Sequence, residues 1–315
     1  MMDNGIVQLV MLAGGGHIAS VTHRDKPGVN PLWVPIWKTM EPWQFNPAKH
    51  SSKYESRLIS SICGHNICLG WFGSASVDEQ KAGMVTHGEA PVVKWTVKAK
   101  KSGSSLELVC ECILPAAQMK LQRTVSMKKG TDVIAVREAV LSMSKRDMPF
   151  TMCEHVTLGP PFLEKGVTFF DMSAVKSHTF QGKFSDRPRL RQNRAFVWPK
   201  GPGIDGRVVE MRTIGEEYKS SSDFSTHMTD NLKEEAWFSA VNPKAGVMLA
   251  YIWKRKDFPW LGNWEENYAR RIQPWAGKSL TRGMEFTNTP FPVPLRDAVN
   301  MNNFQGQPTF RWLTA

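Results

Sequence analysis

The sequence has no apolar run long enough to cross a membrane, and its N-terminus carries no basic leader. The first apolar stretch, residues 6–13, is interrupted by Gln8 and runs into three glycines, and Asp3 precedes it. A transmembrane helix needs about 20 consecutive apolar residues, and a signal peptide needs positive charge before its apolar segment. We therefore expect no membrane partner and a cytoplasmic location.

Cysteine is scarce and poorly spaced for cross-links or metal binding. The five cysteines are Cys63, Cys68, Cys110, Cys112 and Cys153. Two cysteines two residues apart on a strand point to the same side, which does not suit a local disulfide. No pair has zinc-finger spacing. We expect buried free thiols and no metal site.

Positive charge is abundant but not concentrated. The chain of 315 residues carries 40 Lys and Arg against 29 Asp and Glu, a net charge of +11, and it shows no recognisable nucleic-acid-binding module. We therefore expect no nucleic-acid partner. The excess of basic residues is compatible with a phosphorylated or uronic-acid ligand. The candidate anion contacts for such a ligand are Arg187, Arg189, Arg191 and Arg194.

Apolar and polar residues alternate over many short segments, and no helical period is sustained. This pattern, in a chain that is 41% hydrophobic, predicts an all-β fold, a large antiparallel β-sandwich formed by one domain over residues 1–315. Gly14–Gly16 predicts a tight bend between two strands. The expected strands are Ile6–Leu12, His17–Thr22, Val92–Lys98, Leu106–Leu114, Met119–Ser126, Asp132–Leu141, Phe150–Leu158, Val167–Phe170, Val208–Ile214, Trp237–Val241, Val247–Trp253 and Gly283–Thr287.

Aromatic residues interleaved with glycine and proline predict a ligand-binding loop over residues 253–264. Trp260 and Trp264 are candidate platforms for the apolar face of a sugar, with the alternative that they seal an edge of the sandwich. Glu265 and Glu266 follow directly and can bind sugar hydroxyls or form a solvated face. Residues 182–206 read as a long loop, and Ser220–Ser222 as a flexible loop tip.

Two histidines and a glutamate stand in short motifs that suit proton transfer. His87 lies in Thr-His-Gly-Glu, His155 in Glu-His-Val-Thr-Leu-Gly-Pro-Pro, and Glu285 in Gly-Met-Glu-Phe-Thr. Imidazole titrates near neutral pH and a carboxylate can act as a base, so such a set needs no cofactor. Glu154 precedes His155 on the same strand and so points to the opposite face.

Taken in order, these motifs resemble those of the aldose 1-epimerase (galactose mutarotase-like) superfamily. The likeness includes the glycine bend, the segment Gly64-His65-Asn66 followed by Gly70-Trp71-Phe72-Gly73, and the residues around His87, His155 and Glu285. Ile67 follows Asn66 where mutarotases usually carry an arginine. That departure puts ordinary hexose recognition in doubt.

The resemblance implies a galactose mutarotase-like supersandwich that opens and recloses a sugar hemiacetal without a cofactor. Glu285 would be the base towards the anomeric hydroxyl, His155 the acid towards the ring oxygen, and His87 a polarising group. Asn66, His65, Trp260, Trp264, Glu265 and Glu89 would bind the sugar or oligosaccharide.

Other functions stay open at this point. Glu89 competes with Glu285 for the role of base, or forms an ordinary salt bridge. The fold family also admits a non-catalytic carbohydrate-binding module, or a sugar lyase or glycoside-processing enzyme. A hydrolase needs a pair of acids, for which Glu265 or Glu266 with Glu285 is the candidate. The sequence leaves the oligomeric state open.

Overall fold

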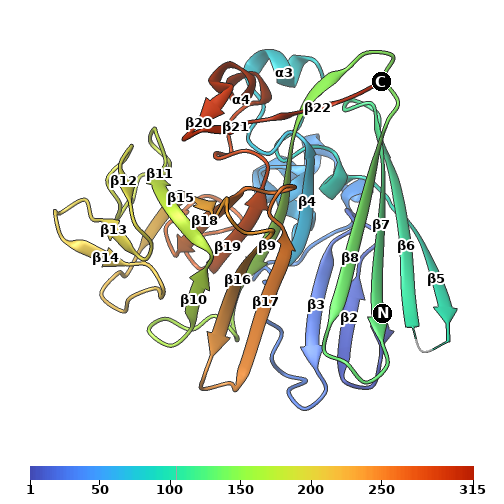
Figure 1. The fold of residues 1–315 in the computed structure, drawn as a ribbon, viewed down its shortest axis with the longest axis horizontal. Helices are drawn as coiled ribbons and strands as arrows, with labels where there is room; N and C mark the ends of the chain where they lie inside the picture. The colour runs from blue at the N-terminus through green and yellow to red at the C-terminus, as the bar shows by residue number, and fades with distance from the viewer. Residues whose placement is uncertain (104) are drawn as a thin grey trace.

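The computed structural model describes residues 1–103 and 105–315, which form mainly antiparallel β-sheets (Figure 1). This confirms the predicted fold class. All five cysteines are buried and unbridged, as expected. Gly15 and Gly16 form the predicted bend, each with a positive φ that glycine adopts without strain.

One large sheet, here called the main sheet, runs through the centre of the molecule in the order β1-β2-β3-β4-β9-β19-β18-β15-β11-β12, with β22 on the end of β9. The strand bounds are β1 Met2–Asp3, β2 Val7–Met11, β3 Ile18–His23, β4 His65–Gly70, β9 Met148–Leu158, β11 Ala174–Thr179, β12 Ala195–Phe196, β15 Ser221–Thr229, β18 Trp260–Asn267, β19 Leu280–Thr287 and β22 Arg311–Leu313.

Two smaller sheets complete the sandwich. A four-stranded sheet consists of β5 Thr96–Ser102, β6 Ser105–Leu114, β7 Met119–Lys128 and β8 Ile134–Ser142, and a three-stranded sheet of β10 Phe169–Met172, β16 Glu235–Asn242 and β17 Val247–Lys254. Two short hairpins are β13 Lys200–Pro202 with β14 Val208–Glu210, and β20 Asn303–Phe304 with β21 Gln307–Pro308.

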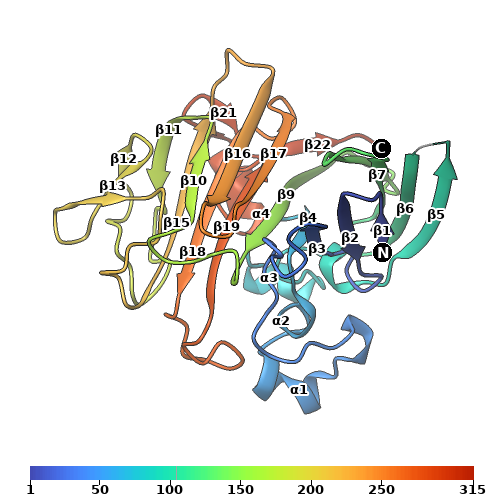
Figure 2. The ribbon, with the colours of Figure 1, turned by 90° about the horizontal axis from the view of Figure 1, so that it is seen from below.

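The helices are all short, and those formed by residues 47–81 lie across the main sheet from β16 and β17 (Figure 2). The helices are α1 Pro47–Tyr54, α2 Arg57–Ser61, α3 Val77–Lys81 and α4 Leu295–Met301, with the 3-10 turns η1 Pro42–Gln44 and η2 Ala90–Val92. Asn46 and Ser56 cap α1 and α2 by accepting backbone amide hydrogen bonds. No helix in the described residues is both long and apolar enough to span a membrane.

Strand alternation gives the main sheet two chemically distinct faces. Asn66, His155, Glu285, Gly262 and Thr226 are partners in register across β4, β9, β19, β18 and β15, so they share one face, here called the front face. The residues one position along each strand point to the other face, here called the back face. A functional group therefore changes face with a shift of a single residue.

The back face carries the apolar core between the main sheet and the smaller sheets. Trp253 stacks on Phe286 at 4.5 Å between ring centroids, and Tyr251 stacks on Phe238 at 5.1 Å. Burying such rings provides most of the favourable free energy of folding. The core thus fixes β19, and with it Glu285 on the opposite side of the same strand.

A buried ion network also lies on the back face and links three sheets. Arg123 of β7 contacts Glu138 at 2.6 Å and Glu154 of β9 at 2.9 Å. Glu154 binds His65 of β4 at 2.6 Å, and the other ring nitrogen of His65 lies 3.2 Å from the Tyr251 hydroxyl of β17. Because Arg123 is the cation shared by the buried carboxylate of Glu154 and the partly buried carboxylate of Glu138, the join between β7 and β9 depends on it.

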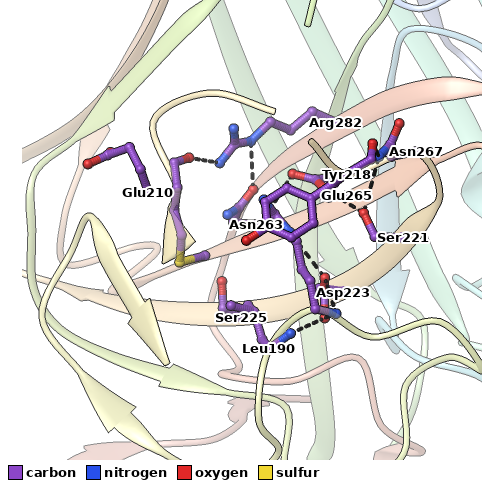
Figure 3. Close-up of polar contacts among 12 residues, drawn as sticks. Leu190, Glu210, Tyr218, Ser221, Asp223, Ser225, Asn263, Glu265, Asn267 and Arg282 are labelled. Carbon is purple, nitrogen blue, oxygen red and sulfur yellow. Dashed lines mark hydrogen bonds and ion pairs between the residues drawn. The ribbon is translucent and has the colours of Figure 1, made fainter. Parts of the chain in front are cut away.

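A second buried polar cluster occupies the back face near β13 and β14 (Figure 3). Arg189 pairs with Asp223 and with Glu265, and Arg282 donates to the side-chain oxygen of Asn263 at 2.8 Å. Arg282 also donates to the backbone carbonyl of Met211, which directly follows β14. These contacts tie the long segment between β11 and β15 onto the main sheet.

Several strand and loop predictions are wrong. Residues 92–98 are mostly outside β5, which begins at Thr96, and β14 ends at Glu210 rather than Ile214. Ser221 and Ser222 belong to β15 and are buried, so they are not a loop tip, and Trp260 and Trp264 belong to β18, not to a loop. Every residue of β15 and β18 is buried, which removes the period of two that identifies a half-exposed strand.

Replacing Arg123 with Met should lower the free energy of unfolding by about 3–5 kcal/mol, because the buried Glu154 would lose its cation, as would the partly buried Glu138. Chemical denaturation monitored by tryptophan fluorescence measures this loss. Lys120→Met on the same strand is the matched control. Lys120 is half-exposed, and its replacement should change stability by no more than about 0.5 kcal/mol. Equal effects at both positions would refute the role assigned to Arg123.

Candidate functional site

Asn66, His155 and Glu285 lie side by side on the front face because their three strands pair directly. His155 is the register partner of Asn66 on one side and of Glu285 on the other. The Nε2 atom of His155 lies 3.2 Å from Oε1 of Glu285. The other ring nitrogen lies 3.1 Å from the hydroxyl of Thr157, which fixes the plane of the ring. Two of the three predicted catalytic residues are therefore in contact.

His87 reaches the same cluster from the loop after α3. Its backbone has φ of 64°, the left-handed conformation that is uncommon for residues other than glycine. One ring nitrogen, Nδ1, hydrogen-bonds the carbonyl of Phe72, and the ring centroid lies 5.2 Å from that of His155. Strained backbone of this kind persists where surrounding contacts impose it, and it is frequent at functional sites. The three predicted catalytic side chains thus meet.

The carboxyl of Glu285 fits because Gly283 has no side chain. A β-carbon at residue 283 would lie 2.3 Å from Oε1 of Glu285 and 3.2 Å from the Trp264 ring. Gly262, the partner of Glu285 on β18, likewise leaves the space beside the carboxyl to the ring of Phe224. These two glycines let a glutamate lie flat against the sheet between two aromatic rings.

Burial sets the protonation of the contacting pair. Desolvation raises the pKa of Glu285 to about 8, an effect that the charge of His87 partly offsets. Desolvation lowers the pKa of His155 well below its usual value, and the charge of His87 lowers it further. At neutral pH the proton between the two groups therefore resides on Glu285, and His155 is neutral.

His87 differs from His155 in the direction in which its pKa is shifted. Burial disfavours the imidazolium, but the neighbouring Cys68 and Glu285 outweigh that effect and raise the pKa of His87. Burial also opposes ionisation of Cys68, yet a hydrogen bond from Cys153 and the charge of His87 lower its pKa to about 6. The cluster accordingly combines one imidazole whose pKa is raised with one whose pKa is lowered.

Aromatic rings enclose the cluster on the side of β18. Trp264 lies 6.0 Å from the His155 ring and meets Trp275 edge-on at 6.1 Å. Trp275 stacks on Trp33 at 5.6 Å, and Trp37 contacts both of these rings. Among the buried donors without a partner in the described residues are the side-chain nitrogens of Asn66, Trp264 and Trp275. Buried unpaired donors are costly, so these three are suited to a ligand that supplies acceptors.

Two predicted binding residues point away from the site. His65 and Glu265 lie on the back face, where His65 binds Glu154 and Glu265 pairs with Arg189. Each is one residue from a front-face position, so alternation along the strand sends its side chain into the core. The prediction that these two residues bind the sugar is therefore corrected: both make structural contacts in the core. Arg189, a candidate anion contact, is likewise used in the core.

The remaining predicted residues lie near the cluster without joining it. Glu89 accepts a hydrogen bond from the backbone amide of Ala117, which is a local structural contact. Trp260 is on the front face but packs against Phe304. Glu266 is on the front face beside Trp264, where its carboxylate binds backbone amides of the β18–β19 loop.

The sequence analysis did not identify Phe72, Thr157, Cys68 or Arg270 as part of this region. Thr157 carried a usable signal, because it lies two residues from His155 and must share its face. Arg270 carried none, since a loop residue has no periodicity. No group of three or more His, Cys, Asp or Glu side chains within residues 1–103 and 105–315 is placed to hold a metal ion.

Comparison with solved structures identifies the architecture. A galactose mutarotase-like protein from Clostridium acetobutylicum superposes with a TM-score of 0.64 at 14% identity, covering 99% of this chain and 90% of that one. This chain has the galactose mutarotase-like fold. A candidate aldose 1-epimerase from Klebsiella pneumoniae subsp. pneumoniae MGH 78578 gives a TM-score of 0.68 at 10% identity, over 98% of this chain and 73% of that one.

A galactose mutarotase related enzyme from Lactobacillus acidophilus gives a TM-score of 0.56 at 13% identity, over 100% of this chain and 94% of that one. No family model matches the sequence, and no curated protein matches it. At these identities the likeness establishes the fold alone, and the chemistry has to be argued from the residues in the site.

The Glu285 carboxyl should titrate with a midpoint of about 8, and His87→Asn should move that midpoint higher, because the charge that stabilises the carboxylate is removed. Asparagine tolerates the left-handed backbone at position 87, so the loop is kept. Infrared titration of protein carrying 13C-labelled glutamate, with Glu285→Gln to assign the band, measures both midpoints. A midpoint near 4.5 in the unmodified protein would show that the carboxyl is hydrated.

Proposed function

We propose that the protein is an aldose 1-epimerase-like isomerase that interconverts sugar anomers by acid–base catalysis on its own side chains. The observation that carries this proposal is the meeting of Glu285, His155 and His87 in one buried cluster walled by tryptophan. Opening a hemiacetal needs one proton removed and one delivered, and the cluster holds a carboxyl of raised pKa beside an imidazole of raised pKa.

In the proposed reaction Glu285 in its ionised form takes the proton of the anomeric hydroxyl. The C1–O1 bond becomes a carbonyl while the bond between C1 and the ring oxygen breaks, and the ring oxygen receives a proton. Rotation about C1–C2 presents the other face of the aldehyde. The ring oxygen then attacks C1, its proton returns to the donor, and Glu285 returns its proton to O1, so the protein ends unchanged.

His87 is the proton donor that the electrostatics favour. The sequence motifs suggested His155 for this role, but burial keeps His155 neutral, whereas the pKa of His87 is raised. His87 donates Nδ1–H to the carbonyl of Phe72, which leaves Nε2 as the nitrogen that exchanges a proton in the cluster. In this proposal His155 holds the carboxyl of Glu285 in position and relays protons between His87 and Glu285.

Within the cluster His155 and Glu285 are closed to solvent, whereas His87 is partly exposed. Only 4% of the His155 side chain and 2% of that of Glu285 are exposed. A sugar can reach them only when the segments above the front face move aside. Exclusion of water at other times preserves the raised pKa of Glu285 on which the proposed chemistry depends.

Replacing Glu285 with Gln should slow anomer interconversion by about 10²–10⁴-fold, because the base is lost without a change in volume. Polarimetry of freshly dissolved α-aldoses measures the rate. Glu89→Gln is the matched control, since glutamine can still accept the Ala117 amide hydrogen bond, and its rate should stay within about twofold of the parent. An equal loss in both variants would remove Glu285 from the mechanism.

If the protein accelerates anomer interconversion of no aldose in a broad panel, the proposal that it is an isomerase is contradicted. If sugars then quench tryptophan fluorescence, the protein is a carbohydrate-binding module. If an unsaturated product with new ultraviolet absorbance forms, it is a lyase.

The pH profile of the rate should be bell-shaped, because Glu285 must lose its proton and His87 must keep its own. The maximum should lie between the raised pKa of His87 and the value of about 8 for Glu285. Replacing His87 with Asn should remove the limb on which the rate falls with increasing pH. A flat profile from pH 5 to 9 would exclude both groups from the rate-determining step.

A further inference from the structure

Arg270 lies beside the candidate site and takes no part in the chemistry proposed above. It belongs to the loop of residues 268–279 that joins β18 to β19. Its guanidinium lies 5.2 Å from the centre of the Trp264 ring and 4.8 Å from that of Trp275. Trp264 in turn contacts His155. Two indole rings therefore hold a cation at the edge of the catalytic cluster.

Arg270 uses few of its side-chain hydrogen-bond donors within the described residues. Its ion-pair partner in the described residues is Glu266, through Nε alone at 3.5 Å. The Oε1 atom of Glu266 already accepts the backbone amides of Ala269 and Arg270 at 2.6 and 2.8 Å. The two terminal nitrogens of the guanidinium make no hydrogen bond with the part of the chain that the structure describes, and 36% of the side chain is exposed. A planar fork with two free nitrogens is the group that binds carboxylate and phosphate in a bidentate manner.

The surroundings favour an anion more than a second cation or a neutral group. The loop itself carries Arg270, Arg271 and Lys278 and has no acidic residue. Glu55 and Glu285 also act on Arg270, but Glu285 is mostly protonated at neutral pH. The unpaired donors of Trp264 and Trp275 next to the guanidinium likewise call for acceptor oxygens.

We propose that Arg270 is a specificity-determining residue that binds an anionic group of the sugar, so that the substrate class is an acidic aldose. The anion is a carboxylate or a phosphate carried on a carbon away from C1, since Trp264 separates Arg270 from His155. This inference rests on the proposed function. The sequence analysis named the arginines of residues 187–194 as candidate anion contacts. The inference gives that role to Arg270, which lies on a different loop.

The test compares the anomerisation of α-D-glucose, D-glucuronate and D-glucose 6-phosphate by the full chain. At least one anionic sugar should be favoured over glucose by about tenfold or more in kcat/KM. The two anionic arms distinguish carboxylate from phosphate. In Arg270→Gln that preference should disappear through a higher KM for the anion, whereas Arg270→Lys should keep part of it. Arg271→Gln, an exposed arginine of the same loop, is the matched control and should retain the preference.

Equal kcat/KM for glucose and both anions, or a preference that survives in Arg270→Gln, would overturn the inference while leaving the isomerase intact. Quenching of tryptophan fluorescence by each sugar separates the two proposals. If no sugar is interconverted but an anionic sugar binds in an Arg270-dependent manner, the anion-binding role of Arg270 is supported and the proposed isomerase activity is contradicted. Thermal unfolding of the three variants checks that each is folded before rates are compared.

Discussion

The structure depends on one constraint, the alternation of side chains across the main sheet. Neighbouring residues on one strand serve two separate sets of charges. Glu154 belongs to the ion network with Arg123 on the back face, and His155 to the cluster with Glu285 on the front. Glu265 and Glu266 divide in the same way between Arg189 and Arg270. Both faces are buried, so each charge has a partner on its own side and none can be shared through the sheet.

The division of charge gives the two faces different electrostatic characters. On the back face Arg123 and Arg189 each touch two carboxylates, and such pairs orient the strands without offering an exchangeable proton to a ligand. On the front face desolvation raises the pKa of Glu285 and lowers that of His155, whereas the neighbouring Cys68 and Glu285 raise that of His87. Burial that stabilises one side of the sheet thus creates reactive groups on the other.

Much of this arrangement follows from the sequence and part of it does not. The half-exposed strands around residues 106–141 were predictable, because one face meets solvent and the period of two is visible. Strands β15 and β18 were missed because both of their faces are buried. The meeting of His87, His155 and Glu285 was expected from motifs. The wrong placement of His65 and Glu265 came from treating sequence neighbours as spatial neighbours, which a strand does not permit.

The hairpin that carries Arg270 begins on the strand of Trp264 and ends on the strand of Glu285. The length of this loop therefore sets the distance between the guanidinium of Arg270 and the carboxyl of Glu285. Insertions or deletions between residues 268 and 279 would shift the guanidinium relative to the front face while the paired strands keep the carboxyl in place. In a scaffold of this kind, changes in one loop can alter the range of ligands while the core stays the same.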